Sequence, residues 1–347
     1  MSELLTLKGT NGVSEIHIEN GLLSRATAVI GETFSPSRIH IVSDSTVAPL
    51  YLQKLEQQFT LPVTHTIIPA GEEHKRLATV EGIYHDLLAS GMTRKDLIVA
   101  LGGGVVGDIT GFAAATFLRG VSLCQIPTTL LAQVDSSVGG KTGVDMPEGK
   151  NLVGAFYQPR LVLIDPSVLT TLPEQTFADG MAEVVKYGYI SNRDILDMVS
   201  APDYKQNIES IIYECVKIKR DVVTIDEHDT GLRMILNFGH TIGHAAEKLG
   251  NYVDLTHGQA VAVGMVAAMR LSAFLGNEDL TGRLIEILKH IGLPTELKYD
   301  REDIYRSLLS DKKKFGATVN FILVREPGRA EITPIDAEKL HEYVLKL

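Results

Sequence analysis

The chain has 347 residues, of which 43 are acidic and 33 are basic, giving a formal net charge of −10. This length exceeds one ordinary core and predicts two domains. The content of 44% hydrophobic and 22% charged residues excludes a disordered, collagen-like or coiled-coil chain. The acidic balance, with no run of five like charges, excludes a protein whose main task is to hold nucleic acid.

The cysteines and the first residues indicate the compartment. Cys124 and Cys215 are too few for a disulfide framework or a thiolate zinc site. The start, MSELLTLKGT, lacks the basic and apolar segments of a secretion signal, and no apolar run reaches the ~18 residues of a membrane span. We therefore expect a cytoplasmic protein with a small-molecule partner, and neither nucleic acid nor a membrane.

Short β-rich runs alternate with helical patterns through the first half of the chain. Such alternation is typical of strand–helix–strand crossovers and predicts a mostly parallel sheet. The β-rich runs cover residues 38–43, 63–69, 96–101, 121–127 and 161–165.

From about residue 172 onwards, longer amphipathic stretches replace this alternation and predict a mainly helical half. Two late β-rich runs, residues 319–324 and 330–335, are joined through Pro327 and Gly328 and predict a hairpin. The fold class is therefore an α/β domain followed by a mainly α-helical domain, with a tight boundary near residue 170. The expected helices cover residues 204–223, 239–249, 259–275 and 282–291.

A glycine-rich segment, residues 102–108, follows one predicted strand and precedes a helical pattern. It has the form G-x-G-x-x-G, in which glycines let a helix N-terminus approach a pyrophosphate. Unlike the usual dinucleotide motif, it is not on the first strand, and no acid follows about 20 residues later. Asp44, at the end of an earlier strand, is the candidate ribose contact instead. A tight turn without a ligand is the alternative interpretation.

A second glycine-rich segment, residues 135–143, contains Lys141 within a Gly-Lys-Thr sequence and is similar to a phosphate-binding loop. A P-loop needs glycine where Asp135 stands, so we exclude an ATPase. Lys150 and Asn151 follow closely and add a second cation. The segment predicts a site for a phosphate ester or a nucleotide, with lysines that are simply solvated as the alternative.

Three histidines and one glutamate predict a metal site in the helical half. His240 and His244 are spaced i, i+4 and share one helix face, but the residue after His240 is not the glutamate of H-E-x-x-H. His257 precedes another apolar helix, and Glu183 is the candidate carboxylate in an otherwise apolar stretch. Such a His-His-acid set leaves positions open to substrate oxygens. From spacing alone, His240 would pair with His244, and purely structural histidines are the alternative.

Taken together, these motifs resemble the 3-dehydroquinate synthase family. The resemblance spans roughly residues 40 to 320 with the motifs in the same order, so that chance agreement is negligible. The matching segments are residues 102–108, Arg119-Gly120, residues 127–131, 134–143 and 149–151, Ala182-Glu183, Lys186, Arg233 and residues 237–244.

The resemblance implies a homodimeric enzyme that uses NAD and a divalent metal, with Zn²⁺ expected and Co²⁺ as an alternative. Residues 1–170 become a Rossmann-like NAD-binding domain, and residues 171–347 a mainly helical domain for metal and substrate. The implied metal ligands are Glu183, His240 and His257, which replaces the pairing of His240 with His244. The implied NAD contacts are Asp44, Glu72, Lys75, Gly104, Val105, Val106, Gly107, Asp108, Thr128, Thr129, Lys141, Lys150, Leu169, Thr170 and Thr171. The implied substrate contacts are Asp135, Lys141, Asn151, Lys186, Lys219, Arg233, Asn237, His244, Lys313 and, from the neighbouring subunit, Arg119.

The reaction implied by the resemblance is a step of the shikimate pathway towards aromatic amino acids. It converts 3-deoxy-D-arabino-heptulosonate 7-phosphate to 3-dehydroquinate and phosphate. NAD oxidises the C5 hydroxyl transiently, with the alkoxide stabilised by the metal; phosphate leaves, hydride returns, and an intramolecular aldol step closes the ring. A cationic and amide pocket holds the phosphate in reach, and a neutral His244 is the expected proton relay.

Three positions depart from the family pattern. Asp145 stands where asparagine is usual, and Asp229 stands where glutamate is common, although both still offer an oxygen. The segment of residues 311–316 is shorter than usual, which leaves Lys312 and Lys314 as alternatives to Lys313.

Three other functions each leave a different feature of the sequence without an explanation. Sibling sugar phosphate cyclases, which make 2-deoxy-scyllo-inosose or epi-valiolone, act on sugars without a carboxylate and have no use for a clamp of Arg233 with Lys219. A net NAD-dependent polyol dehydrogenase does not need so many phosphate-seeking cations. A non-catalytic nucleotide-binding domain does not explain Glu183, His240 and His257 together.

Overall fold

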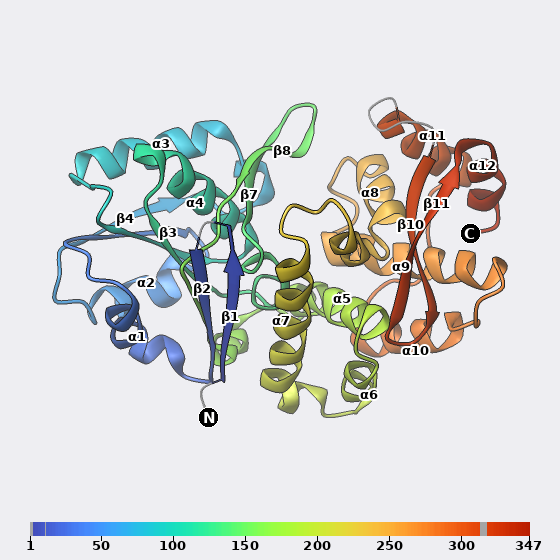
Figure 1. Ribbon diagram of the computed structural model, residues 1–347, viewed down its shortest axis with the longest axis horizontal. Coiled ribbons are helices and arrows are strands. Elements are labelled where there is room, and N and C mark those ends of the chain that lie inside the picture. Colours follow the sequence, from blue (N-terminus) through green and yellow to red (C-terminus); the bar gives the residue numbers. More distant parts are fainter. Residues whose placement is uncertain (1–2, 11, 313–317) are drawn as a thin grey trace. The chain divides into compact units, whose positions relative to one another are not determined.

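The computed structural model describes residues 3–10, 12–312 and 318–347 (Figure 1). The chain forms two compact units, and their division at residues 172 and 173 lies close to the expected boundary. It differs from a simple two-part division because residues 219–228, placed by the sequence analysis in the second half, belong to the first unit. The first unit comprises Met1–Leu172 with Lys219–His228, and the second comprises Pro173–Ile218 with Asp229–Leu347.

The first unit is built on a seven-stranded sheet with the strand order β1-β2-β9-β6-β5-β3-β4. From β2 to β4 every neighbouring pair is parallel, which confirms the predicted sheet, and β1 pairs antiparallel with β2 at the edge. The N-terminal hairpin of β1 and β2 was not predicted. The strands are β1 (Glu3–Gly9), β2 (Gly12–Ile18), β3 (Ile39–Asp44), β4 (Val63–Ile68), β5 (Leu97–Gly102), β6 (Ser122–Pro127) and β9 (Leu161–Ile164).

Helices cover both faces of this sheet because its central strands are apolar on both sides. On β5, Leu97, Val99 and Leu101 join a buried cluster with α1 and α2, whereas Ile98 and Ala100 join another with α3 and α4. This alternation follows from the two-residue period of a strand. The helices are α1 (Ala26–Thr33), α2 (Ala48–Glu56), α3 (Leu77–Ala89) and α4 (Gly104–Thr116), with short 3₁₀ helices η1 (Leu22–Arg25), η2 (Glu72–His74), η3 (Phe117–Arg119) and η5 (Pro166–Thr171).

A separate two-stranded hairpin carries the second glycine-rich segment. Strands β7 (Lys141–Met146) and β8 (Gly149–Phe156) pair antiparallel, with an irregularity between Val144 and Met146. A short π-helix, η4 (Ala132–Ser136), precedes the hairpin. Lys141 and Lys150 therefore lie on strands, so the expectation of a loop at Lys141 was wrong.

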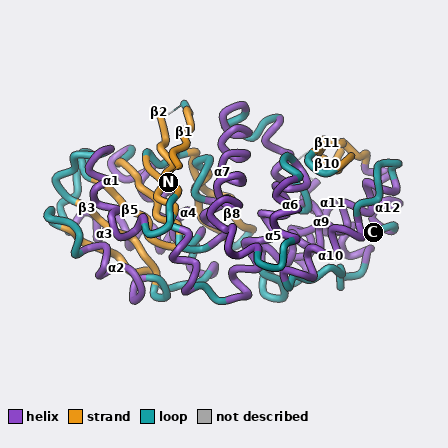
Figure 2. Tube along the Cα trace, turned by 90° about the horizontal axis from the view of Figure 1, so that it is seen from below, coloured by secondary structure: helices purple, strands orange, loops and turns teal. Residues whose placement is uncertain are grey.

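The second unit is mainly helical, as predicted, and contains one predicted β-hairpin (Figure 2). Helices α8, α9, α11 and α12 pack with this hairpin around a buried apolar cluster. The hairpin consists of β10 (Thr318–Glu326) and β11 (Arg329–Asp336), which pair antiparallel. The helices are α5 (Glu174–Ile190), α6 (Asp194–Ser200), η6 (Tyr204–Asn207), α7 (Ile208–Ile225), whose last turns belong to the first unit, η7 (Leu232–Asn237), α8 (His240–Leu249), α9 (His257–Phe274), α10 (Thr281–Ile291), α11 (Arg301–Lys312) and α12 (Ala337–Leu345).

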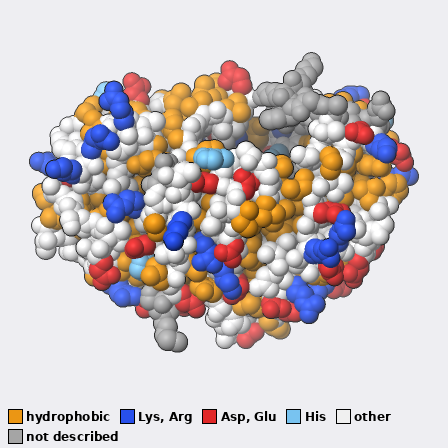
Figure 3. Space-filling model, in the orientation of Figure 1, with side chains coloured by type: hydrophobic (Ala, Val, Ile, Leu, Met, Phe, Trp, Pro, Cys, Tyr) orange, Lys and Arg blue, Asp and Glu red, His pale blue; other side chains and the backbone are white. Residues whose placement is uncertain are grey.

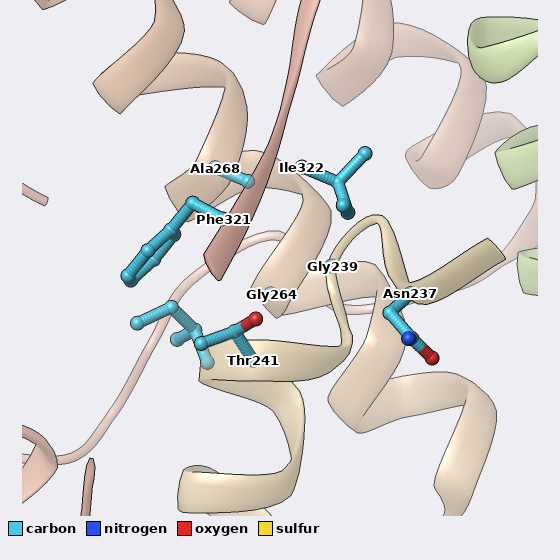
Figure 4. A pocket seen from close by; sticks show the side chains of 8 residues that line it. Asn237, Gly239, Thr241, Gly264, Ala268, Phe321 and Ile322 are labelled. Atoms are coloured by element: carbon cyan, nitrogen blue, oxygen red, sulfur yellow. The ribbon is translucent and has the colours of Figure 1, made fainter. Parts of the chain in front are cut away.

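Helices α8 and α9 approach each other closely at two glycines. Gly239 has φ +81°, a conformation that favours glycine, and α8 begins at the next residue. A Cβ atom on Gly264 of α9 would lie 2.0 Å from the carbonyl oxygen of Gly239. Figure 4 shows the Gly239 turn beside Gly264, with Phe321 of β10 lining the same small pocket. This close packing brings the start of α8, with His240, against α9, which begins at His257.

We expect the substitution Gly264→Ala to destabilise the second unit, because overpacking against backbone costs about 1–3 kcal/mol or more. Urea denaturation measures the free energy of unfolding. Gly282→Ala on α10 is the matched control, since an added Cβ there meets nothing within 4 Å and alanine favours a helix by about 0.5–1 kcal/mol. Equal free energies of unfolding for Gly264→Ala and the wild type would contradict this packing.

Charged side chains of both signs are interspersed on the face drawn in Figure 3. On this face the described basic residues do not form one extended patch. Within the described parts of the chain, no helix is both long and apolar enough to span a membrane.

Candidate active site

The candidate NAD-binding residues lie at the carboxyl ends of parallel strands. Asp44 ends β3, Gly102 ends β5, and Thr128 follows β6. From β3 the chain moves outward to β4 and then returns to β5 on the other side of β3, so the topological switch point lies between β3 and β5. Open α/β sheets bind ligands at this position.

The glycines of residues 102–107 allow close packing at this switch point. A Cβ atom would lie 2.6 Å from Val106 Cγ2 if added to Gly102, and 2.9 Å from Thr129 Cγ2 if added to Gly103. Helix α4 begins at Gly104, so that its first amides lie at the carboxyl end of β5; Val105 and Gly107 lie in the same turns. The buried hydroxyl of Thr128 has no hydrogen-bond partner among the described residues. The packing interpretation and the ligand interpretation of these glycines are therefore compatible.

Lys75 is the centre of a polar network in the first unit. Its side chain is almost fully buried, and Nζ donates to Asp108 Oδ2 and to Asn151 Oδ1, each at 2.6 Å. Glu72 Oε1 lies 4.0 Å from Lys75 Nζ and 3.9 Å from Lys150 Nζ. The structure thus brings five of the sequence-predicted residues together around one buried ammonium group.

Burial and charge pairing oppose each other in this network. Burial raises the pKa of Asp108, and the ammonium of Lys75 offsets the rise only in part. Burial lowers the pKa of Lys75, but the carboxylates of Asp108 and Glu72 outweigh burial and raise that pKa overall. Lys75 is therefore a charged group at neutral pH, held by the acids around it.

Asp145 fixes the backbone of Asn151. Asn151 has φ +55°, in the left-handed region that non-glycine residues rarely adopt. The Asn151 N–H donates to Asp145 Oδ1 at 2.7 Å, and the Asp145 N–H donates to the carbonyl of Lys75 at 2.7 Å. The aspartate at this position keeps the oxygen acceptor that the usual asparagine would offer.

The other predicted residues of the first unit have partners of their own. Asp44 Oδ1 accepts from two following backbone N–H groups, at 2.8 and 2.9 Å. Lys219 Nζ donates to the carbonyl of Asp135 at 2.7 Å and pairs with its carboxylate. Thr171 Oγ1 lies 2.6 Å from the hydroxyl of Tyr51. Leu169, Thr170 and Thr171 share η5, directly after β9, and Thr129 Oγ1 accepts the Ala132 N–H.

Arg119 is exposed and lies in a strained turn. Leu118, Arg119 and Gly120 all have positive φ values, of 49°, 67° and 119°. For non-glycine residues such a conformation costs about 1–3 kcal/mol each and concentrates at functional positions. The turn holds Arg119 at the surface of the first unit.

In the second unit, Glu183, His240 and His257 converge. Glu183 Oε1 lies 3.4 Å from His240 Nε2 and 3.2 Å from His257 Nε2. One ligand atom from each residue lies within 4.8 Å of the others. One carboxylate and two imidazoles form the donor set of many catalytic zinc sites, so these residues fit a divalent metal.

The carboxylate of Glu183 is buried on α5 beside a buried cation. Its exposed fraction is 1%, and it pairs with Lys186, one turn further along the same helix. Burial by itself raises the pKa of Glu183, but the Lys186 ammonium and the His240 imidazole outweigh burial and hold the pKa well below the usual range. Glu183 is therefore an ionised carboxylate in an otherwise apolar stretch of α5.

The N-terminus of α9 sets the position of His257. Thr256 caps the helix in a capping box with Gln259. Asp179 of α5 accepts hydrogen bonds from the Thr256 hydroxyl and the Gln259 N–H. His257 is the first helical residue after this cap. Because Asp179 of α5 holds the cap, α5 fixes the position of the His257 backbone.

The remaining predicted residues of the second unit lie around these three. His244 is exposed, with its ring centre 5.3 Å from that of His240 and 6.3 Å from that of His257. Arg233 is buried on η7, which packs against α5 and ends at Asn237. Lys313 lies outside the described residues.

Two acids beside the histidines, the buried Glu247 and the half-buried Asp179, were missed by the sequence analysis. Glu247 is seven residues after His240, on the same face of α8, and its Oε1 lies 3.4 Å from His257 Nδ1. The i, i+4, i+7 spacing from His240 is the signal that could have found it. Asp179 carries no such signal, because its contact with the cap of α9 joins two helices far apart in sequence.

Two family models match this chain. The 3-dehydroquinate synthase N-terminal model covers residues 65–179, and the 3-dehydroquinate synthase C-terminal model covers residues 180–314. The chain belongs to the 3-dehydroquinate synthase family. A 3-dehydroquinate synthase of Pelobacter propionicus is 45% identical over 352 residues, covering 98% of each chain. One of Streptococcus sanguinis is 44% identical, covering 96% of this chain and 97% of its own.

Solved structures of sugar phosphate cyclases share the fold of this 3-dehydroquinate synthase family member. A 2-deoxy-scyllo-inosose synthase, complexed with carbaglucose-6-phosphate, NAD⁺ and Co²⁺, is 27% identical with a TM-score of 0.85 and 99% coverage of both chains. The 2-epi-5-epi-valiolone synthase of Streptomyces hygroscopicus, with NAD⁺ and Zn²⁺ bound, is 26% identical with a TM-score of 0.87, covering 96% of this chain and 95% of its own. They confirm a Rossmann-like first domain and a helical second domain.

Proposed function

We propose that this enzyme converts 3-deoxy-D-arabino-heptulosonate 7-phosphate to 3-dehydroquinate and inorganic phosphate, as a carbon–oxygen lyase of the shikimate pathway. The observation that carries the proposal is the convergence of Glu183, His240 and His257 in a chain of this family. A non-catalytic nucleotide-binding domain would have no use for this ligand set.

Sequence similarity favours this reaction over those of the sibling cyclases. The identity is 45% and 44% to two 3-dehydroquinate synthases, against 27% and 26% to the inosose and valiolone synthases. The substrate of the proposed reaction carries a carboxylate in addition to its phosphate. Arg233, buried on η7, offers the bidentate guanidinium that suits a carboxylate.

Glu183, His240 and His257 would hold the metal, for which we propose Zn²⁺ with Co²⁺ as the alternative. Both ions occur in the solved cyclases described above. When bound, the ion supplies a Lewis acid that stabilises negative charge on substrate oxygens. Lys186, paired with Glu183, keeps the carboxylate ionised for this role.

The carboxyl ends of β3, β5 and β6 would hold NAD. The amides at the start of α4 suit its pyrophosphate, and the buried Thr128 hydroxyl lacks a partner among the described residues. When bound, NAD supplies a hydride acceptor and later in the same turnover a hydride donor. Lys75, Asp108 and Glu72 would fix the nearby β8 residues Lys150 and Asn151 through the contacts described above.

Cations and one imidazole of the chain would bind and protonate the substrate. Lys186 and Arg233 are buried, so little solvent would screen their interaction with an anionic group of the substrate. Lys141 and Asn151 would hold the phosphate within reach of the proton that is removed as phosphate leaves. His244, exposed beside His240, would move a proton as a neutral imidazole.

We further propose a homodimer in which Arg119 serves the phosphate pocket of the neighbouring subunit. Its exposure and the strained backbone of its turn support this role. If an Arg119→Ala chain is mixed with a Lys141→Ala chain, a shared pocket puts both changes in one site of each mixed dimer. The other site of that dimer then keeps both residues, so substantial activity should return on mixing. Absence of recovery would contradict the sharing, because unshared pockets leave one change in each site.

Phosphate release from two substrates tests the reaction. The protein with NAD and Zn²⁺ should release phosphate from the heptulosonate phosphate and form 3-dehydroquinate, detected by mass. Glucose 6-phosphate, which has no carboxylate, should release little under the same conditions. Faster release from glucose 6-phosphate would favour a sibling cyclase instead.

A further inference from the structure

Glu247 is a buried acid that the proposed reaction leaves without a role. It lies on α8 with an exposed fraction of 3%. A carboxylate in such a place is costly unless a charged or hydrogen-bonding partner compensates for its lost hydration. Its partner on α9 is His257, whose Nδ1 lies 3.4 Å from Glu247 Oε1.

His257 lies between two carboxylates that face its two ring nitrogens. Nε2 faces Glu183 Oε1 at 3.2 Å, and Nδ1 faces Glu247 Oε1 at 3.4 Å. A neutral imidazole carries a hydrogen on one nitrogen and a lone pair on the other, and the hydrogen bond made by one nitrogen decides which atom binds a metal. If Nε2 binds the metal, Nδ1 carries the hydrogen, so Glu183 lies on the metal-binding side of the ring and Glu247 on its donor side.

Two possible ligand sets share His257, and geometry distinguishes them. The first is Glu183 with His240, and the second is His244 with Glu247. In the first set, the Nε2 atoms of His240 and His257 both face one oxygen, Glu183 Oε1. In the second set, His244 is exposed, and its ring centre lies 6.3 Å from that of His257, against 5.3 Å for His240. The first set is the more convergent one, which leaves Glu247 outside it.

We propose that Glu247 is a positioning residue for His257. Its carboxylate accepts the Nδ1–H of the imidazole and holds Nε2 towards Glu183. The hydrogen bond fixes both the tautomer and the ring orientation, while the α9 cap on Asp179 fixes the backbone. This inference rests on the proposed function, because it takes Glu183, His240 and His257 as the metal ligands.

The dissociation constant for Zn²⁺, measured on the full chain by competition with a chromogenic chelator, tests the inference. Glu247→Ala should weaken Zn²⁺ binding by about 10- to 100-fold. Glu247→Gln should weaken it less, because the amide oxygen still accepts the Nδ1–H without the charge. Glu286→Gln, an exposed change on α10, should leave the dissociation constant unchanged, and His240→Ala should weaken binding more than either Glu247 variant.

The visible absorption of bound Co²⁺ separates positioning from direct ligation, and thermal melting of the metal-free variants checks their folding. Glu247→Gln saturated with Co²⁺ should keep the wild-type band pattern, whereas His240→Ala should change it. Wild-type Zn²⁺ affinity in both Glu247 variants, or a Co²⁺ spectrum altered by Glu247→Gln as much as by His240→Ala, would overturn the inference. Unchanged binding in His240→Ala would instead contradict the proposed metal site itself.

Discussion

Replacing His257 with alanine is expected to abolish tight binding of a divalent metal and, with it, phosphate release. The change removes one of three ligands, so affinity should fall by more than the ~100-fold upper range for residues outside the ligand set. Metal content after dialysis against a defined free Zn²⁺ concentration measures the effect. The prediction depends on the position of His257 Nε2, 3.2 Å from Glu183 Oε1.

His85→Ala is the matched control, because His85 is an exposed histidine on α3 of the first unit. It should retain wild-type metal content and activity. Far-ultraviolet circular dichroism of both variants checks that each is folded. A folded His257→Ala protein with a full equivalent of tightly bound Zn²⁺ would show that the metal is held elsewhere.

Replacing Lys75 with methionine is expected to destabilise the first unit and to weaken NAD binding. The substitution removes the ammonium that lies 2.6 Å from Asp108 Oδ2 and leaves a carboxylate that is only one-fifth exposed. Breaking a buried ion pair in this way costs ~3–5 kcal/mol, and partial exposure of Asp108 places the effect at the lower end. Urea denaturation and NAD titration measure the two effects, with the exposed Lys54→Met on α2 as control.

The destabilisation should depend on pH in a defined direction. The pKa of Asp108 is already raised in the native protein because burial outweighs the effect of Lys75, and it should rise further in Lys75→Met. A raised native pKa costs stability in full above that pKa, and the cost disappears as the pH falls from there to the pKa of the unfolded state. The difference in free energy of unfolding should therefore be largest near neutral pH and shrink as the pH falls through the raised pKa. Combining Lys75→Met with Asp108→Asn should recover stability; no recovery would contradict the ion-pair explanation.

The parallel sheet and the helical half were predictable because their signals are local. Each core strand is a short apolar run, and β5 shows the reason: Ile98 and Val99 belong to buried clusters on opposite faces of the sheet, so neither position can be polar. The β1–β2 hairpin was not predictable in the same way, because its place in the sheet depends on pairing with β9, which joins residues as distant in sequence as Glu15 and Leu161. The hairpin of β7 and β8 was not predicted, because the glycines of residues 135–143 are typical of a loop.

The candidate site was predictable only in part from spacing. The i, i+4 rule correctly places His240 and His244 on one helix face, with ring centres 5.3 Å apart. It gives no information about Glu183, which reaches His240 and His257 from another helix, and here the family resemblance supplied what spacing could not. Glu247 and Asp145 were given no positioning role in the sequence analysis. The residues that they contact are brought next to them only by the folded structure, so local spacing does not reveal these contacts.

The ratio of phosphate released to NADH accumulated tests the central claim most directly. The account requires NAD to be restored in every turnover, so NAD at a small fraction of the substrate concentration should support many equivalents of phosphate release. Absorbance at the NADH band should rise only transiently on mixing. Accumulation of one NADH for each substrate consumed would contradict the account and identify a net dehydrogenase.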